Sequence, residues 1–199
     1  MTGISRRRWG RASWLRVGAA VLAAACGGRA GPKNRVDPTA IRVVPLASVI
    51  VLETAGPPPS DTTVTFTAGE PRVIVLRHGP PENVVFAELV FPPSAFRADS
   101  GRPVRVEVRP RPGVYGLDLT TSVPIGEGAT VAFKYARYFS APARARAAYG
   151  SDVLYERALA VAQYRAGGEV ALLPSTHPVA DNLQSALPAA GTYVVAAAP

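Results

Sequence analysis

Proline and glycine divide this chain into short apolar segments, and that punctuation restricts it to a β-rich fold. Its 199 residues include 20 prolines and 18 glycines, and prolines stand in runs at residues 57–59, 80–81 and 92–93. Proline lacks a backbone donor and clashes with the preceding helical turn, so long helices cannot cross these positions. The valine-rich segments left between the breaks are typical of short strands.

Residues 104–109 show the clearest strand pattern in the chain. Val104, Val106 and Val108 fall on one face, and Arg105, Glu107 and Arg109 fall on the other. This period of two predicts a strand with one face in the core and one in water. Further strands are expected at residues 41–44, 48–52, 62–67, 72–77, 84–91, 115–119 and 129–139. The series predicts a mainly β fold, an antiparallel β-sandwich over residues 41–199.

Two later segments have a mixed pattern. Residues 141–149 are rich in alanine, opened by Pro142 and closed by Gly150, which predicts one short helix near residues 142–149. The composition of residues 152–165 favours a helix. However, Gly167 and Gly168 stand between two apolar runs, as in a hairpin turn that needs positive φ. We therefore expect residues 156–165 to pair with residues 169–173.

Short motifs add two resemblances for the folded part. Tyr193 follows Gly191 at the start of an apolar run, and it resembles the tyrosine corner of Ig-like sandwiches, whose hydroxyl bonds to the upstream backbone. A core tyrosine at a strand start is the alternative. Residues 91–96 resemble the apolar–Pro–x–x–Ala strand exit of ZU5-type domains, and residues 115–124 and 129–135 resemble the next two strands. The likeness spans residues 62–139 and departs at residues 124–128, and it implies an interaction-type sandwich without specifying a function.

The first 25 residues have the composition of an export signal. Arg6, Arg7 and Arg8 precede an apolar run at residues 17–25, which is less than half of the roughly 20 residues that a membrane-spanning helix needs. A basic head, a short apolar run and small final residues are typical of a signal peptide. Residues 5–11 also resemble a twin-arginine export motif, with an ordinary basic leader as the alternative.

Cys26 is the single cysteine of the chain, and it follows three alanines. Residues 23–26 resemble the lipobox of the type II signal peptides of bacterial lipoproteins, with Ala23 where that family usually has leucine. The resemblance implies cleavage before Cys26 and lipidation of its thiol. Cleavage by signal peptidase I after Ala25 is the alternative. Residues 26–40, rich in glycine, proline and charge, then read as a lipidated tether in front of an ectodomain of residues 41–199.

The strong positive charge of the chain belongs to the leader. Five of the 22 basic residues and none of the 14 acidic residues lie in residues 1–25, so the formal charge falls from +8 to +3 when they are removed. The basic composition is therefore no indication of a nucleic-acid partner.

Residues able to carry chemistry are few. The chain has two histidines, His78 and His177, both in expected turns. Ser175, His177 and Asp181 lie too close together in sequence to expect triad geometry, which requires nucleophile, base and orienting acid in line. No zinc-ligand spacing or phosphate-binding loop occurs in the sequence. We therefore expect a non-catalytic protein with no metal and no cofactor.

One surface stands out as a candidate binding face. Arg105, Arg109 and Arg111 are expected near Tyr115, and arginine forks with aromatic rings could bind anionic glycans or lipid headgroups. A solvated strand face balanced by Glu107 is the alternative. A second basic cluster consists of Lys134, Arg137, Arg144 and Arg146.

These features predict a protein held at the membrane of a cell envelope by its N-terminal lipid, on the periplasmic or outer face. Its ectodomain would have a binding or structural role, with another envelope protein or an anionic surface polymer as partner. An accessory envelope hydrolase is the alternative function.

Overall fold

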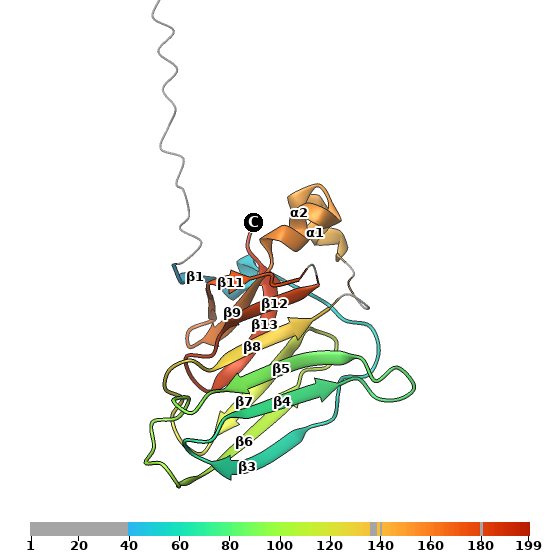
Figure 1. Ribbon diagram of the computed structural model, residues 1–199. Helices are drawn as coiled ribbons and strands as arrows, with labels where there is room; N and C mark the ends of the chain where they lie inside the picture. The colour runs from blue at the N-terminus through green and yellow to red at the C-terminus, as the bar shows by residue number, and fades with distance from the viewer. Residues whose placement is uncertain (1–39, 136–138, 140, 180) are drawn as a thin grey trace, which may run out of the picture. The chain divides into compact units, whose positions relative to one another are not determined.

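The computed structural model describes residues 40–199, apart from residues 136–138, 140 and 180 (Figure 1). The leader, Cys26, the tether up to residue 39 and Arg137 lie outside the described residues. The elements in chain order are β1 (Arg42–Pro45), the 3-10 helix η1 (Leu46–Ser48), β2 (Ile50–Val51), β3 (Thr62–Thr67), β4 (Arg72–Arg77), β5 (Val85–Phe91), β6 (Pro103–Pro110), β7 (Gly116–Thr121), β8 (Thr130–Lys134), α1 (Ala143–Tyr149), α2 (Asp152–Ala158), β9 (Ala160–Arg165), β10 (Glu169–Leu172), β11 (Ser175–Thr176), β12 (Asn182–Ala186) and β13 (Gly191–Ala197).

Two antiparallel sheets form a β-sandwich, which confirms the predicted fold class (Figure 1). The larger sheet has the order β1-β10-β9-β13-β7-β6-β3, with β2 paired to β13. The smaller sheet has the order β11-β12-β8-β5-β4. The predicted strands at residues 62–67 and 72–77 have the bounds of β3 and β4, which are the end strands of the two sheets.

The main core lies between the two sheets and follows the alternation of the sequence. Val104, Val106 and Val108 of β6 are fully buried, whereas Arg105 and Arg109 face solvent. The opposing sheet contributes large side chains such as Leu89, Val131 and Phe133. Burying one row of each strand removes apolar area from water at roughly 25 cal/mol per Å².

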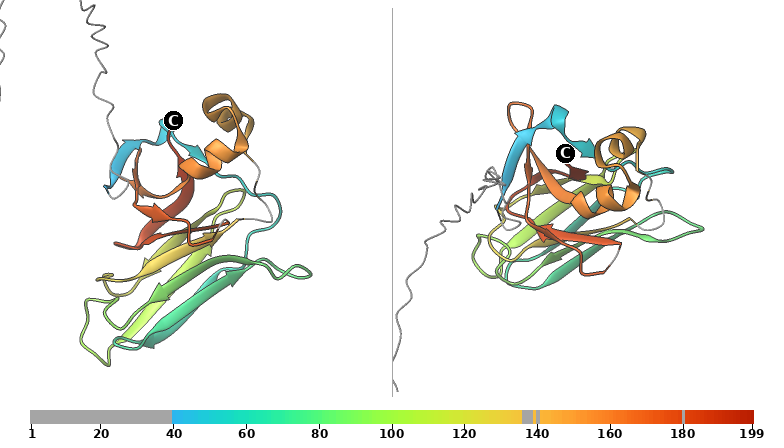
Figure 2. Two further views of the ribbon diagram at one scale, coloured as in Figure 1. Left: turned by 45° about the horizontal axis from the view of Figure 1, so that its top comes forward. Right: turned by 90° about the horizontal axis from the view of Figure 1, so that it is seen from above.

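A second, smaller core explains why the last strands are apolar on both faces. In β13, Tyr193 and Val195 face the main core, while Val194 and Ala196 face the small one. Strands β1, β10, β9, β13 and β2 pair in succession, and η1 joins β1 to β2, so these elements close into a ring (Figure 2). The small core fills this ring, with Val49 and Leu172 among its members.

The tyrosine-corner contact occurs at Tyr193. Its hydroxyl donates a hydrogen bond to the carbonyl of Ala189, four residues upstream, and accepts one of 3.0 Å from Gln163 Nε2. The predicted backbone contact of this side chain is therefore present, and it fixes the turn that leads into β13.

Between β8 and β9 the chain holds two helices instead of one. The predicted helix near residues 142–149 is α1, but α2 was missed. The predicted hairpin is present as β9 and β10, with Gly167 and Gly168 at φ 78° and 75°. Its first strand starts at Ala160, so the expected start at Glu156 was wrong, because Ser151 caps a helix there through the N–H of Leu154. Within the described ranges, no helix is long and apolar enough to cross a membrane.

Candidate functional site

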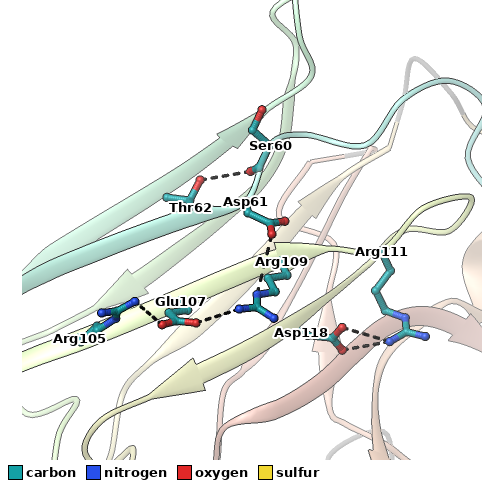
Figure 3. Close-up of polar contacts among 8 residues, drawn as sticks. All are labelled: Ser60, Asp61, Thr62, Arg105, Glu107, Arg109, Arg111 and Asp118. Carbon is teal, nitrogen blue, oxygen red and sulfur yellow. Dashed lines mark hydrogen bonds and ion pairs between the residues drawn. The ribbon is translucent and has the colours of Figure 1, made fainter.

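The predicted arginine face lies on the outer surface of the larger sheet (Figure 3). Strand β6 directs Arg105, Glu107 and Arg109 away from its buried valines. Residues 63 and 65 of β3 pair with this strand at Glu107 and Arg105, so threonines border the charged row. The structure thus confirms that Arg105 and Arg109 share one face.

Glu107 stands between the two arginines and pairs with both. Its carboxylate lies 2.6 Å from Arg105 Nη2 and 3.4 Å from Arg109 Nη2 (Figure 3). Asp61 adds a carboxylate 3.9 Å from Arg109 Nε. Each such exposed pair stabilises the fold by only about 0–1 kcal/mol. The main consequence of these pairs is that Arg105 and Arg109 each have a carboxylate nearby.

Arg111 lies at the end of the same face and has its own carboxylate. Its Nη1 is 3.1 Å and 3.2 Å from the two oxygens of Asp118, which also accepts a 2.6 Å hydrogen bond from Thr192. The guanidinium lies 5.8 Å from the ring centre of Tyr164, as in a cation–π contact. Three arginines therefore meet three carboxylates on the arginine face, which leaves it close to neutral.

Tyr115 does not belong to this face, and its predicted role in ligand binding is wrong. The side chain is fully buried, stacked on Phe86 with ring centres 5.5 Å apart, and its hydroxyl donates to the carbonyl of Tyr135. Burial raises the pKa of the Tyr115 phenol from 10.0 to about 12. The signal was in the sequence, because Tyr115 has the same parity as the inward Leu117 and Leu119.

The described residues of the second basic cluster, Lys134, Arg144 and Arg146, do not gather into one site. Lys134 pairs with Glu88 at 3.8 Å on the outer face of the smaller sheet. Arg146 pairs with Asp152 at 2.8 Å. Arg144 instead donates to the carbonyl of Val49 and so holds α1 on the ring of strands.

His78 is buried in a turn and contacts an aromatic ring. Its ring packs edge-on against Phe86 at 5.4 Å, and its Nδ1 lies 3.3 Å from the carbonyl oxygen of Pro57. The turn borders a cavity of about 330 Å³ that is lined mainly by prolines and glycines. His78 therefore has the surroundings of a structural histidine.

The residues of the tempting triad have separate surroundings. Ser175 Oγ donates to the carbonyl of Leu173 and accepts from the N–H of Val161, both at 2.9 Å, so its hydroxyl is committed to the backbone. His177 is exposed, and Asp181 uses its carbonyl to accept from the N–H of Tyr135. The arrangement has no activated nucleophile of the kind that triad chemistry needs.

A groove beside α2 was not anticipated from the sequence. This groove, which we call the α2 groove, has a volume of about 420 Å³. It is lined by Val153, Glu156, Arg157 and His177. Glu156 accepts a 3.3 Å hydrogen bond from the hydroxyl of Tyr135, whose pKa is raised by burial and by the nearby negative charge of Glu156. The sequence does not predict this groove, because the expected strand over residues 156–165 includes the last turn of α2.

A further cavity of about 510 Å³ lies at the turns before β8 and β13. Arg97 is its one charged residue, beside an apolar wall that includes Pro124, Ile125 and Pro188. In the part of the chain that the structure describes, no group of three or more His, Cys, Asp or Glu side chains could hold a metal ion.

Comparison with protein-family models, curated proteins and solved structures finds no significant match for this chain. The resemblances to lipoprotein leaders and to ZU5-type domains therefore stay predictions from the residues themselves.

Proposed function

We propose that this protein is a lipid-anchored component of a bacterial cell envelope, attached through Cys26, whose β-sandwich acts by binding another molecule. The order of a basic head, a short apolar run, small residues and a single cysteine carries this proposal. Export would place the sandwich on the periplasmic or outer face of the membrane.

The position of the first strand supports the division into tether and ectodomain. Strand β1 begins at Arg42, one residue after the expected boundary at 41. Sixteen positions separate Cys26 from Arg42. A glycine- and proline-rich segment of that length is ample to hold a folded domain clear of lipid headgroups.

The side chains described above favour binding over hydrolysis. Ser175 is bonded to backbone groups on both sides, and the conspicuous charged surface is the arginine face. Because each arginine of that face has a carboxylate partner, an anionic polymer would have to displace those carboxylates. A protein partner with charges of both signs fits the arginine face better.

The anchor is tested by mass spectrometry of the protein recovered from membranes of its producing cells. We expect a chain that begins at Cys26 and carries acyl groups, and a Cys26→Ser variant that accumulates as uncleaved, unlipidated precursor. A mature chain with an unmodified Cys26 would refute the anchor.

The binding role is tested by crosslinking intact envelopes and recovering the protein with whatever is attached. A Glu107→Arg variant, which leaves the arginine face with two uncompensated positive charges, should lose a protein partner. A Glu88→Arg variant on the other sheet is the matched control. Equal recovery of the partner with both variants would contradict a role for the arginine face.

The hydrolase alternative depends on His177, because it is the histidine exposed in a groove beside a carboxylate. A His177→Ala variant that folds normally but loses an envelope phenotype would favour that alternative over binding.

A further inference from the structure

Two large apolar side chains stand side by side in water on α2. Val153 is 55 % exposed and Leu154 is 52 % exposed. Val179, 56 % exposed, lies two residues beyond His177, which borders the same groove as Val153. We call Val153, Leu154 and Val179 the apolar patch. Adjacent exposed apolar residues of this size commonly mark a surface that contacts another phase or molecule.

The helix that carries the patch is held by contacts to the rest of the fold, so Val153 and Leu154 are not exposed by fraying of the helix end. Tyr155, the buried residue of α2, donates from its hydroxyl to the carbonyl of Ile50. Ser151 caps the helix, and Arg146 of α1 pairs with Asp152. With Tyr155 turned to the core, Val153 and Leu154 are left pointing outward.

Basic side chains border the patch. Arg157 and His177 line the α2 groove next to Val153. In the part of the chain that the structure describes, neither of them has an ion-pair partner. Glu156, the acidic residue of the groove, is bonded to Tyr135. The rim of the patch therefore offers donors to a negatively charged group.

The patch lies at the end of the ectodomain where the described chain begins. In both views of Figure 2, α1 and α2 lie at the same end of the sandwich as β1 and η1. Arg144 of α1 bonds to Val49, and Tyr155 bonds to Ile50, directly after η1. Fifteen residues lie between Cys26 and Arg42, and a glycine- and proline-containing tether of that length would span about 21 Å on average and at most about 54 Å. A lipid on Cys26 would keep this end of the molecule near the bilayer.

We propose that the apolar patch is a second membrane contact: Val153, Leu154 and Val179 enter the interface of a phospholipid bilayer, and Arg157 and His177 contact headgroup phosphates. The inference rests on the lipid anchor proposed above, because the anchor is what brings this end to the surface. Apolar side chains flanked by basic ones are the usual composition of interfacial contacts, and two weak attachments together hold a protein far more firmly than one.

The chain offers a direct optical test. Its two tryptophans, Trp9 and Trp14, both lie in the leader, so replacing them with phenylalanine leaves a background without tryptophan. In that full chain, Leu154→Trp places a single reporter in the patch. Val75→Trp places a single reporter at an exposed valine of β4, in the smaller sheet.

We expect the fluorescence of Leu154→Trp to shift to the blue and to be quenched by vesicles of mixed phosphatidylcholine and phosphatidylglycerol with brominated acyl chains. The Val75→Trp reporter should show neither effect. Equal responses of the two reporters, or no response of Leu154→Trp, would overturn the proposal.

A vesicle sedimentation assay separates this proposal from the anchor. With Cys26→Ser in the background, Val153→Asp with Leu154→Asp should weaken vesicle binding about tenfold or more, because each change replaces an apolar side chain that would enter the bilayer interface with a charged one. The matched control is Val73→Asp with Val75→Asp, at two exposed valines of β4. Both pairs of variants carry the same unlipidated N-terminal segment, so the difference between them reads the patch even if mass spectrometry finds Cys26 unmodified. Unchanged vesicle binding of the Val153→Asp, Leu154→Asp variant would overturn the proposal. If this variant instead lost a dimer seen for the parent in sedimentation velocity, the patch would be an interface between two copies of the chain.

Discussion

At the scale of single residues, buried tyrosines are the chemically distinctive groups of this sandwich. Tyr115 and Tyr193 are fully buried, one stacked on Phe86 and the other closing the tyrosine corner. Alternation along the strands predicts that both side chains point inward, whereas the nearness of Tyr115 to Arg111 in the sequence suggested a place beside the arginine face. A sequence shows which residues share a face, and the aromatic stack that holds Tyr115 depends on Phe86 from the other sheet, which no local pattern reveals.

Burial of these phenols predicts a fold that weakens in alkali. Burial raises the pKa of both Tyr115 and Tyr193 from 10.0 to about 12. A raised pKa in the folded state means that the stabilising contribution is complete below pH 10 and is lost as the pH rises from 10 to 12. The free energy of unfolding in urea should be level from pH 7 to 9 and fall above pH 10. Tyr115→Phe should reduce that slope, and an unchanged slope would contradict the assignment to Tyr115.

At the scale of elements, most strands were predictable from the sequence, whereas their partners, apart from the hairpin of β9 and β10, were not. Residues 62–67, 72–77 and 104–109 became β3, β4 and the centre of β6 because period two and flanking prolines are local signals. The error at α2 came from extending the hairpin of the Gly167-Gly168 turn back to residue 156, whereas Ser151, a residue type that often caps helices, marks a helix start. Both signals were correct, and Leu159 is where helix gives way to strand.

The contact between β7 and β13 depends on one glycine. A Cβ added at Gly116 would lie 2.7 Å from Val194 Cγ1 and 2.8 Å from the carbonyl oxygen of Tyr193. Gly116→Ala should therefore destabilise the fold by about 1–3 kcal/mol, as overpacking usually does. Gly79→Ala is the control, because no atom lies within 4 Å of its Cβ. Equal urea midpoints for the two variants would show that the sheet relaxes around residue 116.

At the scale of the whole molecule, most of the excess charge of the chain lies outside the sandwich. Most of the excess positive charge lies in residues 1–25, and the ectodomain balances its arginines with carboxylates at the arginine face. The main core takes large side chains from both sheets. Only the arrangement in space shows that the apolar patch on α2 and the start of β1 lie at one end, as Figure 2 shows.

Strand β13 joins the two cores, and its removal is expected to unfold the whole ectodomain. It pairs with β9 on one side and with β7 and β2 on the other, and its alternate residues fill the main core and the ring. Deleting residues 191–199 should leave a chain without a cooperative urea transition, because both cores would be opened to water. Deleting Pro199 alone, which lies beyond β13 and is exposed, should leave the transition unchanged. If the longer deletion kept a cooperative transition of reduced size, the sandwich would fold independently of the ring, and the two cores would be separate cooperative units.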